Sequence, residues 1–311
     1  MVGRPLQPAR TLQELVMMAT LAARPPVAHG MAEALGDLAV AVLVDEATLA
    51  PKPGLVDARG NGAHADMTLP LMLASARSLR DGFAAMARAG RQAPRIDVTL
   101  RERLGALGRD AEAAMLRATG GVNTHRGAIW ALGLLAGAAG WLGKTDGARL
   151  HAKAVVQMAA VIARLPDRHR PAQTGNKGEL ACAAYGVGGA REQAEAGFPH
   201  VTGIGLPALR DARARGDAEP TAQVNALLAI MARLDDTCVL ARAGRAGLDD
   251  VQAGAEAVLE VGGIGTLAGR RRLHDLEATM QARQASPGGA ADLLAATLFL
   301  DRLPAVQSGD I

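Results

Sequence analysis

The chain has 311 residues, 49% of them hydrophobic and only 2% aromatic, so it can bury one large core or two modest ones. Its net charge of +3 suits an anionic small molecule, whereas the lack of a clustered basic face with stacking aromatics excludes a nucleic-acid binder. Residues with high β-propensity are scarce. We therefore expect one all-α, multi-helix domain whose active site is built from inter-helix loops.

Two features of the sequence indicate a cytoplasmic protein. Cys182 and Cys238 lack metal-ligand spacing and the density of a disulfide scaffold, which is typical of a reducing compartment. Residues 1–30 read as an extension, because the apolar stretch near residue 15 has no small-residue cleavage site. The longest apolar run, 128–143, is shorter than the roughly 20 residues that span a bilayer, so it is predicted to be a buried helix.

The first core helix is expected at residues 31–50, and two acids, Asp45 and Glu46, stand near its end. A carboxylate at the C-terminal end of a helix is disfavoured by about 0.3 to 1 kcal/mol, so this pair indicates a function. Pro51-Lys52-Pro53-Gly54 follows, and its prolines forbid helix and give a stiff turn. We expect this turn to hold Lys52 out from the backbone.

A glycine-rich stretch after this turn adds Asp57, His64 and Asp66. Asp66 or Thr68 can cap a second helix that runs to about Gly90. Thr99 and Glu102 predict a capping box for the next helix.

That helix is expected to end at Gly120-Gly121, and the segment after it leads directly into the apolar run. Glycines before a helix N-terminus leave backbone N–H groups free to bind an anion. Four polar residues stand at this point, namely Asn123, Thr124, His125 and Arg126. The segment is therefore predicted to be an anion cradle.

The second half of the chain supplies a third polar loop at 174–179, with Asn176 and Lys177, and a flexible glycine-rich segment that carries Arg191. A helix from Pro220 to about residue 234 is expected to end in a second pair of acids, Asp235 and Asp236, with Arg242 close behind. Asp249, Asp250 and Ser286 read as ordinary N-caps of the last helices. The final helix is expected at 290–303, which gives a catalytic domain of 31–304 and a tail of 305–311.

Taken singly, these signals are weak, because Gly-Gly pairs are usually helix C-caps and an Asp before a helix is usually an N-cap. Together, three loops that combine Gly, Asn and a basic residue with two acid pairs beside apolar helices indicate a functional site. The chemistry they suggest is binding of a polyphosphate through Mg²⁺, which prefers a few carboxylates and phosphate oxygens. The chain has no G-x-x-x-x-G-K-[ST] segment, so the P-loop class is excluded.

Several motifs in chain order resemble those of the triphosphoribosyl-dephospho-CoA synthase family. They are Glu46 with Pro51-Lys52-Pro53-Gly54-Leu-Val-Asp57, Gly62-Ala-His64-Ala-Asp66-Met, Gly121-Val-Asn-Thr-His-Arg-Gly-Ala-Ile129, Gly189-Ala-Arg191, Gly197-Phe-Pro, Asp236-Thr237 and Ser286-Pro-Gly-Gly-Ala-Ala-Asp292-Leu-Leu. The resemblance covers roughly residues 38–303. The forms Gly-Ala-Arg191-Glu-Gln-Ala and Asp236-Thr-Cys-Val-Leu look more like the malonate decarboxylase branch than the citrate lyase branch, and they leave open whether Glu192 replaces the family's glutamate.

The resemblance implies an enzyme that uses ATP as a ribosyl donor. The 2′-hydroxyl of 3′-dephospho-CoA would attack C1 of the ATP ribose, adenine would leave, and the product would be the prosthetic-group precursor of the malonate decarboxylase acyl carrier protein. A homodimer is left open. The expected roles divide the residues into catalytic (Glu46, His64, His125, Asp236), phosphate or substrate binding (Lys52, Asp57, Asn123, Thr124, Arg126, Lys177, Arg191, Arg242) and metal binding (Asp45, Glu46, Asp235, Asp236).

Two alternatives stay open from the sequence. The Leu-Asp235-Asp236 segment resembles the aspartate-rich motif of all-helical, Mg²⁺-dependent enzymes that act on diphosphates, although the later acid of that motif is missing. The other alternative is a non-enzymatic assembly factor that delivers the precursor to the carrier protein.

Overall fold

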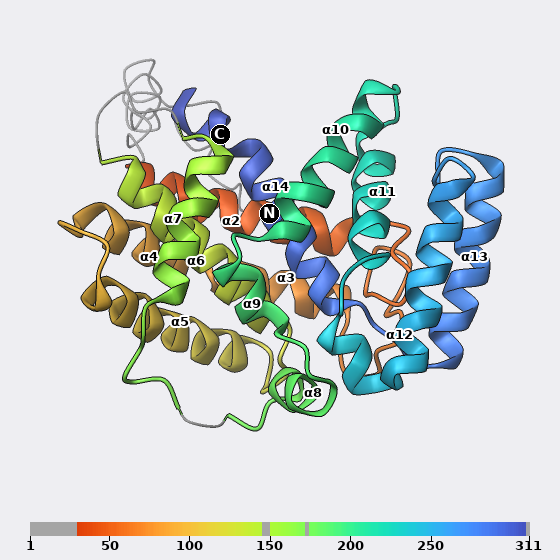
Figure 1. Ribbon diagram of the computed structural model, residues 1–311, viewed down its shortest axis with the longest axis horizontal. Helices are drawn as coiled ribbons and strands as arrows, with labels where there is room; N and C mark the ends of the chain where they lie inside the picture. The colour runs from red at the N-terminus through yellow and green to blue at the C-terminus, as the bar shows by residue number, and fades with distance from the viewer. Residues whose placement is uncertain (1–29, 145–149, 172–173, 309–311) are drawn as a thin grey trace, which may run out of the picture. The chain divides into compact units, whose positions relative to one another are not determined.

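The computed structural model describes residues 30–144, 150–171 and 174–308, and within these ranges all regular elements are helices (Figure 1). In place of a strand, the described residues hold one isolated bridge between Asp57 and Gly60. The expected all-α fold is confirmed. The expected extension at 1–30 lies outside the described residues except for Gly30.

In the first half, α2 (Met31–Thr48), α4 (Arg80–Gln92), α5 (Val98–Ala118) and α7 (Ala152–Arg164) pack around a buried central helix, α6 (Arg126–Leu142). The remaining helix, α3 (Leu69–Ser78), packs against α2 and α5. The apolar run is helical, as expected, and α6 is buried on nearly all sides from Ala128 to Gly140. None of the helices in the described part of the chain is both long and apolar enough to cross a bilayer.

The second half adds a helical pair and a long closing helix. Its elements are α8 (Lys177–Tyr185), α9 (Gly189–Glu195), the π-helical turn η1 (Val201–Gly205), α10 (Leu206–Ala214), α11 (Glu219–Met231), α12 (Thr237–Glu260), α13 (Leu267–Ala282) and α14 (Gly288–Ser308). Helices α12 and α13 pack side by side, and α14 packs against α2, α6 and α11 (Figure 1). Because α14 continues to Ser308, the expected tail at 305–311 is helical as far as that residue.

Three expectations about helix ends need correction. The helix expected to run to Gly90 is two helices, α3 and α4, which meet at Leu79, and Thr68 caps the first of them. Helix α5 is capped by Asp97, whose Oδ1 accepts the Leu100 N–H at 3.1 Å, because the helix begins one residue before the expected Thr99 cap. Asp249 and Asp250 lie inside α12, so they are not caps.

The close approach of α4 and α6 depends on glycines. A Cβ at Gly90 would lie 1.9 Å from the carbonyl oxygen of Gly137, and a Cβ at Gly140 would lie 2.0 Å from that of Ala87. No side chain fits between backbones at these distances, since protein interiors are already close-packed. This contact fixes α6, whose N-terminus opens onto the candidate site.

A valine at Gly140 should therefore destabilise the protein. Overpacking of this kind costs about 1 to 3 kcal/mol and occasionally more, and here backbone atoms would have to move, so we expect Gly140→Val to reach the upper end in urea unfolding. Gly108→Ala is the control, because a Cβ there meets only Met86 Cε at 3.9 Å. That change should leave stability unchanged or raise it by about 0.5 to 1 kcal/mol. Equal stability of the two variants would contradict the packing argument.

Candidate active site

A cavity of about 680 Å³ lies where the three polar loops meet. The residues on its wall come from the end of α2, the loop after it, the loop before α6, the start of α8 and the starts of α12 and α14. Those expected from the sequence are Glu46, Lys52, His64, Asn123, Thr124, His125, Arg126, Lys177 and Arg242. Residues that are distant in the chain are thus brought to one cavity.

Lys52 is buried and bound to Glu46, whereas the sequence led us to expect that the turn holds it out from the backbone, free for a phosphate. Its Nζ donates to the Glu46 carboxylate at 2.5 Å and to the Glu46 carbonyl oxygen at 2.5 Å, and only 2% of Lys52 is exposed. A cation at the C-terminal end of α2 interacts favourably with the helix dipole. The neighbouring acid, Asp45, pairs with Arg302 of α14 at 2.5 Å. Each disfavoured carboxylate at this helix end therefore has its own cation.

Asp57 holds the loop in place and lies outside the cavity wall. Its carboxylate accepts the backbone N–H groups of Lys52 at 2.9 Å and Arg59 at 2.7 Å, together with the Arg59 guanidinium. Burial alone would raise the pKa of Asp57, but the hydrogen bonds from Arg59 and from the Lys52 backbone keep it below its usual value. Asp57 is thus occupied by the backbone of the turn that carries Lys52.

His64 is held as a neutral donor. Because Arg242 can only donate hydrogen bonds, its contact of 3.1 Å with His64 Nδ1 makes that nitrogen the acceptor. The proton then sits on Nε2, which donates to the Ser286 hydroxyl at 2.7 Å. Burial and the positive charge of Arg242 both lower the pKa of His64.

His125 is also neutral, and one of its nitrogens is unpaired. Its Nδ1 lies 2.7 Å from the hydroxyl of Ser75, which in turn lies 2.6 Å from the Thr124 hydroxyl. Burial, with a smaller effect from the charge of Lys52, lowers the pKa of His125 to about 4. Its Nε2 is buried and has no hydrogen-bond partner in the described residues.

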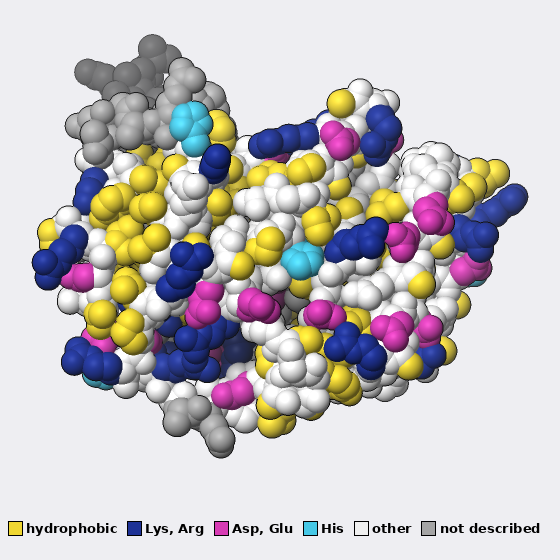
Figure 2. All heavy atoms as spheres, in the orientation of Figure 1, with side chains coloured by type: hydrophobic (Ala, Val, Ile, Leu, Met, Phe, Trp, Pro, Cys, Tyr) yellow, Lys and Arg dark blue, Asp and Glu magenta, His cyan; other side chains and the backbone are white. Residues whose placement is uncertain are grey.

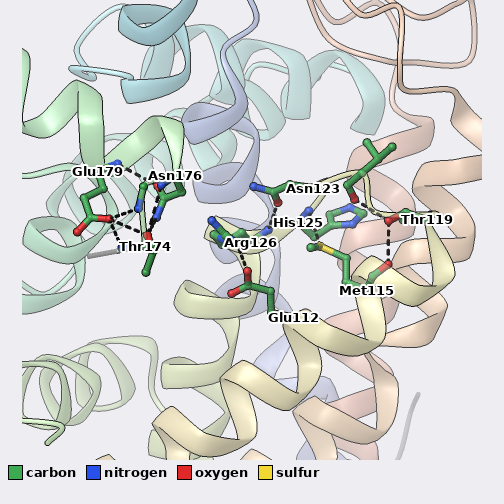
Figure 3. Close-up of polar contacts among 11 residues, drawn as sticks. Glu112, Met115, Thr119, Asn123, His125, Arg126, Thr174, Asn176 and Glu179 are labelled. Atoms are coloured by element: carbon green, nitrogen blue, oxygen red, sulfur yellow. Dashed lines mark hydrogen bonds and ion pairs between the residues drawn. The ribbon is translucent and has the colours of Figure 1, made fainter. Parts of the chain in front are cut away.

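The other two loops present their polar groups from opposite walls (Figure 3). Asn123 Oδ1 accepts the Arg126 N–H at 3.3 Å, and the Arg126 guanidinium pairs with Glu112 of α5. Across the cavity, Asn176 caps α8 by accepting the Glu179 N–H at 2.9 Å. Lys177, the first residue of α8, has no ion pair within the described ranges. It is therefore a cation available to a ligand.

The structure places Asp45, Asp57, Asp235, Asp236 and Arg191 outside the cavity wall. Asp235 is exposed and pairs with Arg245 at 2.9 Å. Asp236 does not end α11 but caps α12: its side chain accepts the Cys238 N–H at 2.8 Å and the Ala290 N–H at 2.9 Å.

The four proposed metal ligands do not fit a shared cation site. Asp45, Glu46 and Asp235 each have a basic partner, and Asp236 is occupied by backbone N–H groups. Within the described residues, no group of three or more His, Cys, Asp or Glu side chains is placed to hold a metal ion. We therefore derive no step from a metal held by these carboxylates.

Asp292 of α14 lies on the cavity wall, although no role was predicted for it from the sequence. It is half-buried, and burial together with the negative charges of Glu46 and Asp236 raises its pKa well above the usual range. Gly127 makes room for it, since a Cβ there would lie 2.0 Å from Asp292 Oδ2. The sequence signal that could have identified Asp292 is that it is the one carboxylate in the largely apolar stretch 290–300.

The CitG family model, described as ATP:dephospho-CoA triphosphoribosyl transferase, matches residues 32–310. The chain belongs to this family. The matched range includes all three loops that line the cavity.

Curated relatives agree with this family. A protein of Stutzerimonas stutzeri (strain A1501), named "Probable 2-(5''-triphosphoribosyl)-3'-dephosphocoenzyme-A synthase", is 58% identical over 95% of this chain and 99% of its own length. A Klebsiella pneumoniae protein, named "2-(5''-triphosphoribosyl)-3'-dephosphocoenzyme-A synthase", is 56% identical over 86% of this chain and 94% of its own. No solved structure is significantly similar.

The buried Lys52–Glu46 pair yields a stability prediction. Removing one partner of a buried ion pair costs about 3 to 5 kcal/mol, because the other charge stays buried alone. We expect this loss for Lys52→Met in urea unfolding, and most of it should be recovered in the double variant Glu46→Gln/Lys52→Met. The matched control is Lys153→Met, an exposed lysine on α7, which should change stability by less than about 0.5 kcal/mol. A Lys52→Met variant as stable as this control would show that the pair is not formed.

The lowered pKa of His125 predicts a pH-dependent stability. In the unfolded chain this histidine titrates near its ordinary pKa of about 6.5, so between pH 6.5 and 4 the unfolded state binds more protons than the folded state. Stability is therefore lost as the pH falls through this window. Between pH 7 and pH 5 the wild type should lose about 2 kcal/mol more than His125→Gln. Urea titrations at both pH values measure this, and equal losses would contradict the assignment.

Proposed function

We propose that this protein transfers the triphosphoribosyl group of ATP to the 2′-hydroxyl of 3′-dephospho-CoA and releases adenine. The observation that carries the proposal is the cavity itself, which combines basic side chains, two histidines whose pKa values are lowered and a carboxyl whose pKa is raised, in a chain that belongs to this transferase family. The cavity volume lies in the range of ligand sites, about 300 to 1,000 Å³.

The reaction exchanges one bond at the ribose for another. The C1′–N9 bond of ATP breaks, and a bond forms between C1′ and the 2′-oxygen of 3′-dephospho-CoA. The hydroxyl loses a proton and adenine gains one, so a base and an acid are both needed. Positive charge develops on the ribose as the bond breaks, as it does in glycoside hydrolysis.

Asp292 is the acid in this proposal. Its raised pKa favours the protonated carboxyl, which can donate to the leaving adenine. Glu46 stays close to it, and its negative charge can stabilise the positive ribose although Lys52 compensates part of it. Two nearby carboxyl groups with different partners thus take different roles.

His125 is proposed to accept the proton of the attacking hydroxyl through its unpaired Nε2. In that state Nδ1–H donates a hydrogen bond to the Ser75 hydroxyl, which holds the ring orientation, so Ser75 is a positioning residue. His64 is the alternative proton carrier, but its Nε2 already donates to Ser286.

The phosphates are proposed to bind between the opposite walls of the cavity. Lys177 is the available cation on one wall, and Arg126 and Arg242 contribute from the others, with Asn123 and Thr124 beside them. Lys52 contributes less than the sequence suggested, because its ammonium is bound to Glu46. If Mg²⁺ accompanies ATP, phosphate oxygens and water would be its main ligands, as is common for this ion.

The motif forms around Arg191 and Asp236 favour a role in the malonate decarboxylase branch. In this proposal the product is passed on for attachment to the acyl carrier protein of that enzyme. Of the alternatives, an aspartate-rich diphosphate site is disfavoured because Asp235 and Asp236 do not face the cavity. An assembly factor without activity would bind the precursor without forming it.

Incubation of the purified protein with ATP and 3′-dephospho-CoA tests the proposed function. Free adenine should appear in step with a product that carries the triphosphoribosyl group, as measured by chromatography and mass spectrometry. Adenine should not appear when either substrate is left out. If both substrates are present and neither adenine nor product forms, the proposed function is wrong.

The acid role of Asp292 has a matched control in Asp235. Removing a general acid typically costs about 10² to 10⁴ in rate, so we expect Asp292→Asn to lower kcat by this amount with little change in melting temperature. Asp235→Asn should keep wild-type kcat, because its carboxylate pairs with Arg245 away from the cavity. Equal kcat values for the two variants would exclude Asp292 as the acid.

A further inference from the structure

A second group of arginines lies outside the cavity wall. Arg101 and Arg109 stand on one face of α5, Arg170 follows α7, and Arg191 belongs to α9. Lys and Arg side chains gather in a hollow between α5 and α8 (Figure 2). Among the described residues, these guanidinium groups interact with Asp167, which contacts Arg101 and Arg109, with Glu195, which pairs with Arg191 at 2.6 Å, and with Glu179, whose pKa Arg170 lowers. The group therefore has an excess of positive charge.

Arg101 is buried without enough partners. A guanidinium has five N–H donors, yet within the described residues the Arg101 guanidinium makes one hydrogen bond, a long contact of 3.4 Å to Asp167. Its Nε is buried and unpaired, and its remaining contact is the Trp130 ring, 5.1 Å from the guanidinium carbon. Only 5% of this residue is exposed. A buried charge with so few partners is costly, so an additional anion would stabilise it.

The residues around Arg101 do not supply the hydrogen-bond partners that its guanidinium lacks. Asp167 is shared, since its Oδ2 also accepts from Arg109 at 3.0 Å. Gly105 lets this cluster close up, because a Cβ there would lie 2.1 Å from Asp167 Oδ2. Burial lowers the pKa of Arg101, and although Asp167 opposes this shift, the charges of the three neighbouring arginines add to it.

The cluster borders the cavity on two sides. Along α5, Arg109 is followed one turn later by Glu112, which pairs with Arg126, and then by Leu116, and both Arg126 and Leu116 are on the cavity wall. The rise of a helix puts Arg109 and Leu116 on the order of 10 Å apart. On the other side, the cluster acts on Glu179. Hydrogen bonds from Thr174 are the main cause of the lowered pKa of Glu179, and the positive charge of Arg170 adds a smaller effect in the same direction. Glu179 holds Gly175 of the cavity wall through a 3.1 Å hydrogen bond.

We propose that Arg101, Arg109, Arg170 and Arg191 form a second anion subsite, next to the cavity, that binds the phosphate chain of a substrate. The proposal rests on the proposed function, which brings a triphosphate and a diphosphate to one site. Both chains have the same chemistry, and guanidinium groups match phosphate oxygens in pairs. The subsite also gives Arg191, which lies outside the cavity wall, a place in phosphate binding.

Charge removal at two members other than the buried Arg101 tests the subsite and leaves Arg101 in place. In Arg109→Gln/Arg170→Gln, the KM for one substrate should rise roughly tenfold or more, with kcat within about twofold of wild type. A higher KM for ATP identifies the triphosphate as the ligand, and a higher KM for 3′-dephospho-CoA identifies the diphosphate. Arg233→Gln, at an exposed pair with Glu256, is the control and should leave both KM values unchanged.

Calorimetric titration with inorganic tripolyphosphate and inorganic diphosphate measures the anion affinity of the subsite independently of enzyme activity. Wild type and Arg233→Gln should bind one of these anions roughly tenfold or more tightly than the double variant does. Absence of adenine release with this binding difference intact would reject the proposed function and keep the anion subsite. Unchanged anion affinity in a double variant with a normal melting curve would overturn the subsite and make the cluster a structural ion network.

Discussion

The buried contact between Lys52 and Glu46 is the interaction on which the rest of the site depends. It joins the end of α2 to the Pro51-Lys52-Pro53-Gly54 turn, and its two charges act in opposite directions on neighbouring groups. Burial is the larger cause in both cases, but the ammonium of Lys52 also lowers the pKa of His125, and the carboxylate of Glu46 also raises the pKa of Asp292. One cavity therefore holds a histidine with a lowered pKa and a carboxyl with a raised pKa, which is the combination that the proposed acid–base catalysis needs.

Packing far from the cavity supplies the precision that this pair needs. The glycine contacts between α4 and α6 fix the helix whose N-terminal end carries His125 and Arg126. The turn around Lys52 is covered from the other end of the chain: Gly54 adopts a φ of +71°, and a Cβ there would lie 2.5 Å from the carbonyl oxygen of Ala285. Each of the three polar loops supplies one part of the cavity wall. Contacts between segments more than 200 residues apart, such as Gly54 and Ala285, bring these parts together.

The features that the sequence predicts correctly are those with local signals. Low β-propensity gives the helices, and glycine, proline and asparagine indicate the loops that the structure brings to the cavity. The errors concern tertiary contacts. Asp236 looks the same whether it ends α11 or caps α12, because only a short connection separates the two helices. The contact of Lys52 with Glu46 is not visible in the sequence, because the segment that covers its turn, around Met280 and Ala285, is distant in the chain. Ser75 and the electrostatic partners of Asp292 are equally invisible without the fold.

Because the Lys52–Glu46 pair is buried, its electrostatic effect should depend little on ionic strength, in contrast to that of the exposed charges of the site. Salt screens exposed charges over about 8 Å at 0.15 M but acts much less on buried pairs. The Lys52–Glu46 contact, which shifts the pKa values of His125 and Asp292, is buried. Lys177, at the N-terminal end of α8, is exposed, and most arginines of the proposed anion subsite are accessible to solvent. If the proposed function holds, added salt should thus weaken the attraction of phosphates while leaving the proton balance of His125 and Asp292 nearly unchanged, so its effect on rate would appear at low substrate concentration and disappear at saturation.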